Sequence, residues 1–327
     1  MSMGPSGSET AACDTLVIAL DSFDEWIESN ELNNVLILRR CEVPEVVADR
    51  WQPAAQELLD GDASSLAGLP IDHSVPVVDL RGGESAARKR LSHFVSTLLS
   101  GYADRRNRPD EDATSGLSPY LHFGHVSPLY LALAAKTAGN HLAAAREAYL
   151  EELIVRRELA INFVTFTLRY DAFACLPGWA RKTLDQHAAD RRHYSYGRQA
   201  LEQGATHDPY WNAAMAEMRD TGFMHNYMRM YWGKKVLEWS PSPREAYETL
   251  LFLNNRYFID GRDPNSFAGV GWVFGLHDRA WFQRDIFGKV RYMAASGLER
   301  KCDIQGYVEK VTALCRRADR PGGRSIP

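Results

Sequence analysis

The chain has 327 residues, 45% of them hydrophobic and 24% charged, a composition typical of globular proteins and unlike that of disordered or collagen-like chains. No apolar run in the sequence approaches the ~18 residues of a membrane span, and the first residues lack the basic start of a secretory signal, so we expect a cytoplasmic protein with no membrane partner. Five widely spaced cysteines form no CxxC pair, which predicts neither a disulfide framework nor a metal site: Cys13, Cys41, Cys175, Cys302 and Cys315.

The net charge of −4 conceals two parts of opposite charge. Residues 1–80 carry 15 acidic and 3 basic side chains, whereas the remainder carries 27 acidic and 35 basic ones. A basic body attracts polyanions, although a merely solvated charged face is the commoner explanation of such an excess. We therefore divide the chain into a short acidic N-terminal segment, residues 1–80, and a larger domain, residues 81–327.

The N-terminal segment contains two short apolar runs, at residues 16–20 and 35–38, which are candidates for strands. A polar leader at residues 1–12 is predicted to be disordered. The runs are separated by an acidic amphipathic stretch, and a Gly/Asp/Ser-rich break follows at residues 61–65. This is too little for a full doubly wound domain, so the segment is predicted to be a small α/β or helical piece.

From Glu84 onward, apolar residues recur at spacings of three and four, and strand-like alternation is scarce. The larger domain is therefore predicted to be all-helical, and the fold class to be mainly α. Three Ser-Pro pairs predict helix starts, because serine caps a helix and proline suits its first position: Ser118-Pro119, Ser127-Pro128 and Ser242-Pro243. Ser242 and Glu245 also fit a capping box.

Hydroxyl groups gather in residues 114–121, shortly after a polar stretch at residues 102–109. Unpaired N–H groups at a helix start suit a phosphate, and simple helix capping is the alternative. Further along, residues 151–163 read as a helix in which Glu152 and Arg156 share a face. Such a pair means little on a surface, but among apolar neighbours it would be half-buried and kept for a ligand.

Five of the eight tryptophans lie between Trp211 and Trp281. A helix from Met224 to Trp239 places Trp232 and Trp239 on one stripe, which is typical of core packing and also of an electron path or a base-stacking surface. The next predicted helix, residues 244–258, carries Asn254 in an apolar stripe, where its amide needs a partner.

Opposite charges also stand in apolar surroundings near this helix. Arg229 and Asp260 would each need the other if they were buried. The polar turn at residues 260–265 and the glycines around Trp272 would let the backbone approach a ligand closely.

Six ordered strings together resemble the flavin-binding domain of the photolyase and cryptochrome family, most closely the class II cyclobutane pyrimidine dimer photolyases. The resemblance runs from about Val78 to about Val311 and rests on residues 114–124, 152–159, 224–232, 253–257, 260–265 and 277–281. It implies an all-helical domain that holds FAD.

The resemblance also implies roles for individual residues around FAD. Five positions match those that hold the diphosphate and ribityl region: Tyr102, Thr114, Ser115, Leu117 and Ser118. The positions that match the surroundings of the isoalloxazine and adenine rings are Arg156, Asn226, Arg229, Asp260 and Gly261. Asn254 matches an asparagine placed near flavin N5 in class II enzymes.

A second group of matching residues concerns the lesion and the electron path. Glu152 matches the acid that hydrogen-bonds a flipped-out dimer, and Met230 and Trp272 match walls of the dimer pocket. Trp232, Trp211 and Trp239 match the class II relay, which reduces the flavin through light-driven hops from the surface.

One departure from the family concerns the antenna domain. Family members usually carry an N-terminal α/β antenna domain of well over a hundred residues, and only about 80 acidic residues precede the match here. The resemblance therefore implies a shortened member in which an antenna chromophore is not expected.

The sequence therefore predicts a monomeric, light-driven repair enzyme that acts on UV-damaged DNA, single- or double-stranded, through reduced FAD. A (6-4) photoproduct photolyase is a close alternative, with His122 and His125 as proton donors. A cryptochrome-like photoreceptor would bind FAD without repair, and a flavin-free nucleic-acid-binding helical protein would be colourless.

Overall fold

The computed structural model describes residues 14–19, 35–40, 70 and 72–318. The chain divides into two units, residues 1–71 and residues 72–327, which are described separately. The predicted leader, the acidic stretch between the two apolar runs and the break at residues 61–65 lie outside the described residues.

In the first unit, the two apolar runs form an antiparallel pair of strands, as predicted. β1 (Asp14–Ala19) and β2 (Val35–Arg40) pair in a register that sets Val17 opposite Ile37 and Leu16 opposite Leu38. Branched apolar side chains favour such extended pairs. The runs therefore predicted both strands to within two residues.

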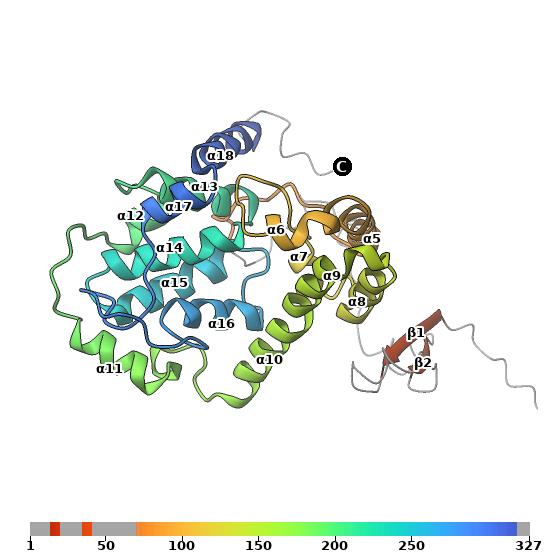
Figure 1. The fold of residues 1–327 in the computed structure, drawn as a ribbon, viewed down its shortest axis with the longest axis horizontal. Helices are drawn as coiled ribbons and strands as arrows, with labels where there is room; N and C mark the ends of the chain where they lie inside the picture. The colour runs from red at the N-terminus through yellow and green to blue at the C-terminus, as the bar shows by residue number, and fades with distance from the viewer. Residues whose placement is uncertain (1–13, 20–34, 41–69, 71, 319–327) are drawn as a thin grey trace, which may run out of the picture. The chain divides into compact units, whose positions relative to one another are not determined.

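The second unit is helical throughout its regular elements, which confirms the predicted fold class. Figure 1 shows helices α13 to α16 in the body of this unit and helices α5 to α9 beside them. The α-helices are α5 (Glu84–His93), α6 (Tyr102–Arg105), α7 (Ser118–His122), α8 (Pro128–Lys136), α9 (Ala143–Leu150), α10 (Arg157–Phe166), α11 (Gly178–Gln186), α12 (Arg198–Glu202), α13 (Pro209–Thr221), α14 (Asn226–Trp239), α15 (Pro243–Tyr257), α16 (Pro264–Val273), α17 (Ala295–Lys301) and α18 (Ile304–Ala318). Tighter or wider helical turns are η2 (Phe94–Leu98), η3 (Leu99–Gly101), η4 (Asn140–Leu142), η5 (Glu151–Arg156) and η6 (Phe173–Cys175).

Two of the three Ser-Pro pairs cap their helices as predicted. Ser127 Oγ accepts from Tyr130 N at 3.0 Å, and Ser242 Oγ accepts from Glu245 N at 3.2 Å. The reciprocal half of the capping box differs, because the Glu245 carboxylate accepts from the Ser242 hydroxyl at 3.1 Å. The third pair also marks a helix start, since α7 begins at Ser118, but Ser118 does not cap it: it is the first helical residue, and the preceding Leu117 offers no capping side chain.

The core of the second unit is built around α14, which is buried along nearly its whole length. It packs against α13, α15 and α16, and its approach to α16 is close because Gly233 has no side chain: a Cβ there would lie 2.5 Å from Val273 Cγ2. α13 ends at Thr221 and is followed by Gly222, whose φ of 67° suits glycine. These close packings place α14, α15 and α16 where their side chains can share one cavity.

Candidate functional site

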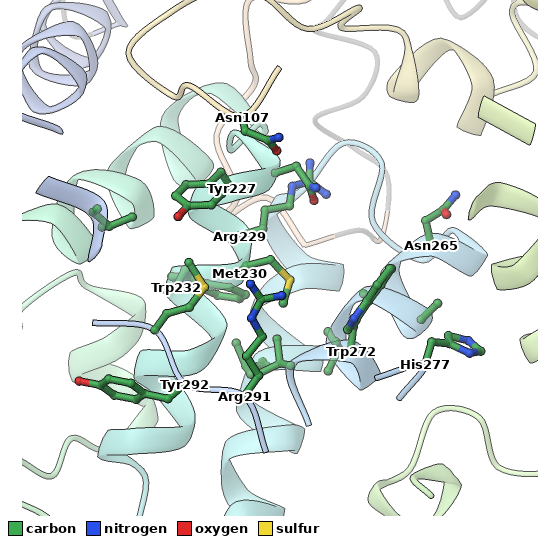
Figure 2. A pocket seen from close by; sticks show the side chains of 18 of the residues that line it. Asn107, Tyr227, Arg229, Met230, Trp232, Asn265, Trp272, His277, Arg291 and Tyr292 are labelled. Atoms are coloured by element: carbon green, nitrogen blue, oxygen red, sulfur yellow. The ribbon is translucent and has the colours of Figure 1, made fainter. Parts of the chain in front are cut away.

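A large cavity of about 980 Å³ opens beside α14, α15 and α16. Figure 2 shows Met230 and Trp232 reaching it from α14, Trp272 from α16, and Arg291 from the segment that follows. Glu152, Arg156 and Asn254 also line it. Its volume lies at the upper end of the range for small-molecule and cofactor sites.

A second cavity of about 300 Å³ is lined by the hydroxyl-rich segment. Five predicted cofactor residues line it together: Tyr102, Thr114, Ser115, Leu117 and Ser118. Arg90 holds this segment by donating to the carbonyl oxygens of Ser115 at 2.6 Å and Thr114 at 3.0 Å. The turn is thereby fixed, with its hydroxyl groups on the cavity.

The two cavities share part of their lining. The side chains common to both are Arg106, Asn107, Glu152, Asn226, Arg229 and Asn265. Shared walls place the cavities next to each other, so one elongated ligand could occupy both. The sequence separations involved are large, from Arg106 to Asn265, and only the packing of α6, η5, α14 and α16 brings these residues together.

Glu152 has a different partner from the one predicted. Its carboxylate accepts from Arg106 Nη1 at 2.5 Å, while Arg156 pairs with Glu151 at 3.1 Å. The reason is local: Glu152 and Arg156 lie in η5, a π-helical turn, where the wider winding moves residues four apart off a common line. Burial and the neighbouring Glu152 carboxylate raise the pKa of Tyr102.

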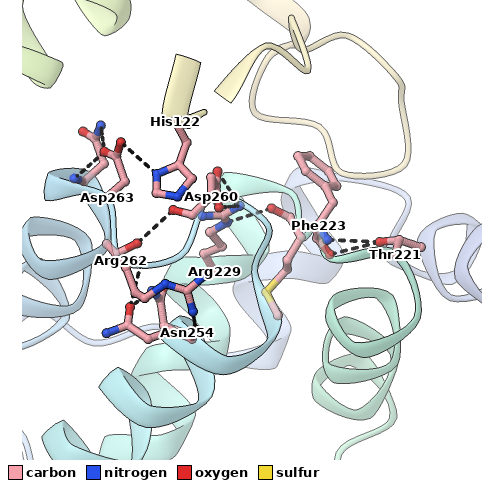
Figure 3. Close-up of polar contacts among 12 residues, drawn as sticks. His122, Thr221, Phe223, Arg229, Asn254, Asp260, Arg262 and Asp263 are labelled. Atoms are coloured by element: carbon pink, nitrogen blue, oxygen red, sulfur yellow. Dashed lines mark hydrogen bonds and ion pairs between the residues drawn. The ribbon is translucent and has the colours of Figure 1, made fainter. Parts of the chain in front are cut away.

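The predicted pair of Arg229 and Asp260 is confirmed. Arg229 Nη2 donates to both carboxylate oxygens of Asp260, at 3.1 and 3.2 Å, and Arg229 Nε donates to Met224 O at 3.0 Å, as Figure 3 shows. The guanidinium carbon also lies 3.8 Å from the centre of the Phe258 ring. These contacts hold a cation and an anion side by side on the wall of the small cavity.

Asn254 is 5% exposed, at the edge of the large cavity. Its amide finds the partner that burial demands in Asn255, since Asn254 Nδ2 donates to Asn255 Oδ1 at 3.0 Å. The same oxygen accepts from Arg262 N at 3.0 Å, and Figure 3 shows Arg262 beside Asn254.

Gly261 lines neither cavity. A Cβ at this position would lie 2.8 Å from Phe258 O and 2.9 Å from Asn254 O. Gly261 therefore lets the chain turn close against the end of α15.

The predicted lesion residues meet at the large cavity. Met230 and Trp272 both line it, and the Arg156 guanidinium lies 5.5 Å from the Trp272 ring. His277, which the sequence reasoning did not single out, also lines the cavity, and the centres of the His277 and Trp272 rings are 6.4 Å apart. Burial and the charge of Arg156 lower the pKa of His277, which favours its neutral form.

The three predicted relay tryptophans form a contiguous series. Trp232 lines the large cavity, Trp211 Nε1 donates to Trp232 O at 3.0 Å, and the rings of Trp211 and Trp239 are 5.7 Å apart. Trp239, at the other end of the series from the cavity, is itself buried, at 2% exposed. His207 covers it at 5.1 Å and stacks in turn on Tyr194, which is 48% exposed.

The histidines named for the (6-4) alternative lie outside both cavity linings. His122 Nδ1 is 3.5 Å from the Asp263 carboxylate, and His125 Nδ1 accepts from Gly83 N at 3.1 Å. The histidine on the large cavity is His277 instead.

Sequence reasoning missed several cationic and polar residues of the large cavity. Arg106 and Asn107 fall inside the polar stretch at residues 102–109, but nothing in its spacing separates them from neighbouring arginines. The cationic residues beyond α16 that line the cavity are Arg284, Arg291, Arg300 and Lys301. Their clustering at one rim depends on how the segment after α16 folds back.

Two further kinds of site are absent from the described residues. No cluster of three histidine, cysteine or acidic side chains there could hold a metal ion. None of the helices in that part of the chain is long and apolar enough to cross a membrane.

Comparison with known proteins supports the resemblance. No family model matches the sequence. The chain is 55% identical over 234 residues to the deoxyribodipyrimidine photo-lyase of Methanothermobacter thermautotrophicus, which covers 72% of this chain and 52% of that protein. It is 44% identical over 294 residues to the rice enzyme of the same name, covering 88% of this chain and 58% of the relative. The chain thus spans little more than half the length of these curated relatives.

Solved structures agree on the fold. A class III photolyase from Agrobacterium tumefaciens matches 91% of this chain and 60% of its own, with a TM-score of 0.58 and 21% identity. A cryptochrome from Synechocystis matches 88% of this chain and 53% of its own, with a TM-score of 0.53 and 20% identity. Sequence relatives reach 55% identity, and residues from the motifs that carry the resemblance line two adjoining cavities. This chain therefore belongs to the photolyase and cryptochrome family.

Proposed function

We propose that this protein splits cyclobutane pyrimidine dimers in DNA with light, with FAD held across the two adjoining cavities. The observation that carries the proposal is that predicted cofactor residues line the small cavity, predicted lesion residues line the large one, and the two cavities share Glu152, Asn226 and Arg229. A ligand in contact with both cavities would lie against the dimer pocket and against Trp232, the relay tryptophan that lines the large cavity.

The residues present fit FAD. Trp232 lines the large cavity, and its buried Nε1 has no hydrogen-bond partner among the described residues, which leaves a donor beside the cavity for a bound polar heterocycle. The small cavity offers the hydroxyl groups of Thr114, Ser115 and Ser118, which suit hydroxylated and phosphorylated parts of a cofactor. When bound and fully reduced, FAD supplies the excited electron that opens the dimer.

The protein's own residues would position the lesion. The Glu152 carboxylate, held by Arg106, would accept a hydrogen bond from the N–H of a flipped pyrimidine. Trp272 and Met230 would pack against the two rings and exclude water. Asn254 and the spacing of Trp211, Trp232 and Trp239 favour a class II enzyme.

The partner is proposed to be UV-damaged DNA. Four cations stand along the rim of the large cavity: Arg284, Arg291, Arg300 and Lys301. Phosphate contacts from such a rim would set the register of a strand while the damaged bases enter the cavity.

The test is blue-light-dependent repair of an oligonucleotide carrying a thymine dimer, single-stranded and duplex, by the reduced full-length chain with a dark control. Repair in the light alone is the expected result. Flavin-loaded protein that repairs no dimer would contradict the proposal. Repair of a (6-4) oligonucleotide in parallel would assign that chemistry instead, and photoreduction without any repair would assign a photoreceptor.

A further inference from the structure

Residues 281–291, here called the rim loop, carry two of the cations that line the large cavity, Arg284 and Arg291. It also exposes Phe282 fully to solvent, at 92%. A loop that offers charged and aromatic groups at the mouth of a cavity loses affinity if it must be ordered at the moment of binding. What holds this loop therefore bears on how well it binds.

Three side chains on α11 and just after its end hold the rim loop, two of them by its backbone. The Asp190 carboxylate accepts from Ile286 N at 2.8 Å, and Thr183 Oγ1 accepts from Lys289 N at 3.0 Å. His187 Nδ1 is hydrogen-bonded to the same carboxylate at 2.5 Å, and His187 Nε2 is hydrogen-bonded to the side-chain nitrogen of Gln283 at 3.1 Å. We call Thr183, His187 and Asp190 the α11 clip.

The proton arrangement of the clip is self-consistent. An ionised carboxylate only accepts, so His187 Nδ1 carries the proton donated to Asp190. Since an amide nitrogen only donates, His187 Nε2 accepts from Gln283 Nε2. Bonding to Ile286 N and to His187 lowers the pKa of Asp190, which keeps it ionised as the clip requires.

The backbone of the rim loop is bent to suit the clip. Ile286 has a φ of 68°, an unusual value for a β-branched residue, which persists only where the surroundings hold it. Gly288, at a φ of 53°, leaves no room for a side chain because a Cβ would collide with Thr183 Oγ1. The side chains of Ile286 and Phe287 are buried in the core, while Arg284 reaches the cavity.

We infer that Asp190 and Thr183 are positioning residues, which hold the rim loop in its DNA-binding shape before DNA arrives. Neither residue lines the cavities, so they act through Ile286 and Lys289 and not on the substrate directly. This inference rests on the proposed function, since it assigns DNA as the ligand of the loop.

The sign of the effect separates positioning from simple electrostatics. Asp190→Ala removes a negative charge beside a cationic loop, which by Coulomb's law alone would strengthen DNA binding. The positioning role predicts the opposite. Thr183→Val keeps the size of the side chain, changes no charge and removes the acceptor of Lys289 N, so it tests the same contact from a second side.

The experiment measures dark binding of a thymine-dimer duplex to the flavin-loaded full chain, hydrogen exchange of the Ile286 and Lys289 amides without DNA, and light-driven repair at saturating DNA. We expect Asp190→Ala and Thr183→Val to raise the dissociation constant on the order of tenfold. Their loop amides exchange faster, and repair at saturating DNA stays within about twofold of the parent. Asp190→Asn retains a carbonyl oxygen as acceptor and is expected to bind more tightly than Asp190→Ala.

The matched control is Asp185→Ala, which removes an equal charge from an exposed position on α11, five residues before Asp190. Unchanged or tighter binding by both clip variants overturns the inference, as does unchanged amide exchange. If Asp190→Ala does not fold, Thr183→Val alone decides. If the parent chain binds no damaged DNA, the proposed function fails, whereas a parent that binds and variants that bind equally well overturn only the role of the clip.

Discussion

At the scale of single residues, the Glu152 carboxylate stands on the shared wall of both cavities. Glu152→Ala should lower repair per absorbed photon by roughly one order of magnitude, less than the loss of a donor from an enclosed oxyanion hole, because Glu152 is 37% exposed. Bound flavin should be unchanged. Quantum yield and flavin content are measured beside Glu151→Ala, whose carboxylate pairs with Arg156 and lines neither cavity. Loss of flavin from Glu152→Ala would assign the residue to the cofactor.

Asp260 is the partner of a half-buried cation. Asp260→Ala leaves Arg229 without its carboxylate beside Phe258, and we expect the free energy of unfolding to fall by about 2 kcal/mol. The comparison is Asp72→Ala, which breaks the pair of Asp72 with Arg256 at 2.8 Å, where Asp72 is 53% exposed and the loss of stability should be smaller than for Asp260→Ala. Urea denaturation of both variants checks the order. Equal losses would mean that burial does not decide the strength of these pairs.

At the scale of the helices, capping side chains set where α13 and α15 begin. Ser242→Ala removes the acceptor of Glu245 N and should cost about 1 kcal/mol. Asp208→Ala should cost more, about 3 kcal/mol, because Asp208 caps two amides of α13 and also accepts from the buried hydroxyl of Tyr231. Asp208→Asn keeps an acceptor for the helix amides and should recover part of the loss. Chemical denaturation ranks the three variants, and a smaller loss for Asp208→Ala than for Ser242→Ala would contradict this ranking.

Helices α13 and α14 carry the proposed relay between them. Trp239→Phe should abolish photoreduction of bound flavin while sparing repair by protein that has been reduced chemically, because the indole next to Trp211 is lost. Absorbance spectra under blue light with an added thiol follow the reduction. Trp179→Phe, on α11 and outside both cavity linings, is the control. Photoreduction at the parental rate in Trp239→Phe would remove that residue from the relay.

At the scale of the whole molecule, two buried bases make stability depend on pH. Burial lowers the pKa of Lys234 to about 7, and burial with the charge of Lys310 lowers that of His225 to about 4. The unfolded chain, with pKa values of about 10.5 and 6.5, binds more protons between each pair of values. Stability should therefore rise as pH increases from about 4 to 6.5 and again from about 7 to 10.5.

The Lys234→Met variant tests the upper window. Methionine fills a similar apolar volume without a charge, so the rise in the free energy of unfolding between pH 7 and 10 should flatten. The hydrogen bond from Lys234 Nζ to Val273 O is lost as well, so the test is the slope with pH and not the absolute stability. Urea denaturation across this range measures the slope. A parental slope in Lys234→Met would place its origin elsewhere.

Local patterns were enough for the helical body, because apolar spacing and capping residues act within a few residues of one another. The start of α15 at Pro243 and the end of α14 at Trp239 follow from such signals. Ser118 shows their limit, since the same Ser-Pro pair opens α7 without capping it. The π-helical turn η5 shows another, because spacing of four assumed ordinary winding and paired Glu152 with Arg156 in place of Arg106.

The sequence by itself determined the family resemblance, the helical class, the two strands at the start and the pairing of Arg229 with Asp260, because residue types and order carry these. Tertiary structure alone decided that Arg106 meets Glu152 across 46 positions and that Trp239 is buried. It also decided that the rim loop is clipped to α11 through Asp190, 96 positions from Ile286. Contacts of such sequence separation depend on how helices pack against one another, and packing direction is not written in the periodicity of any one helix.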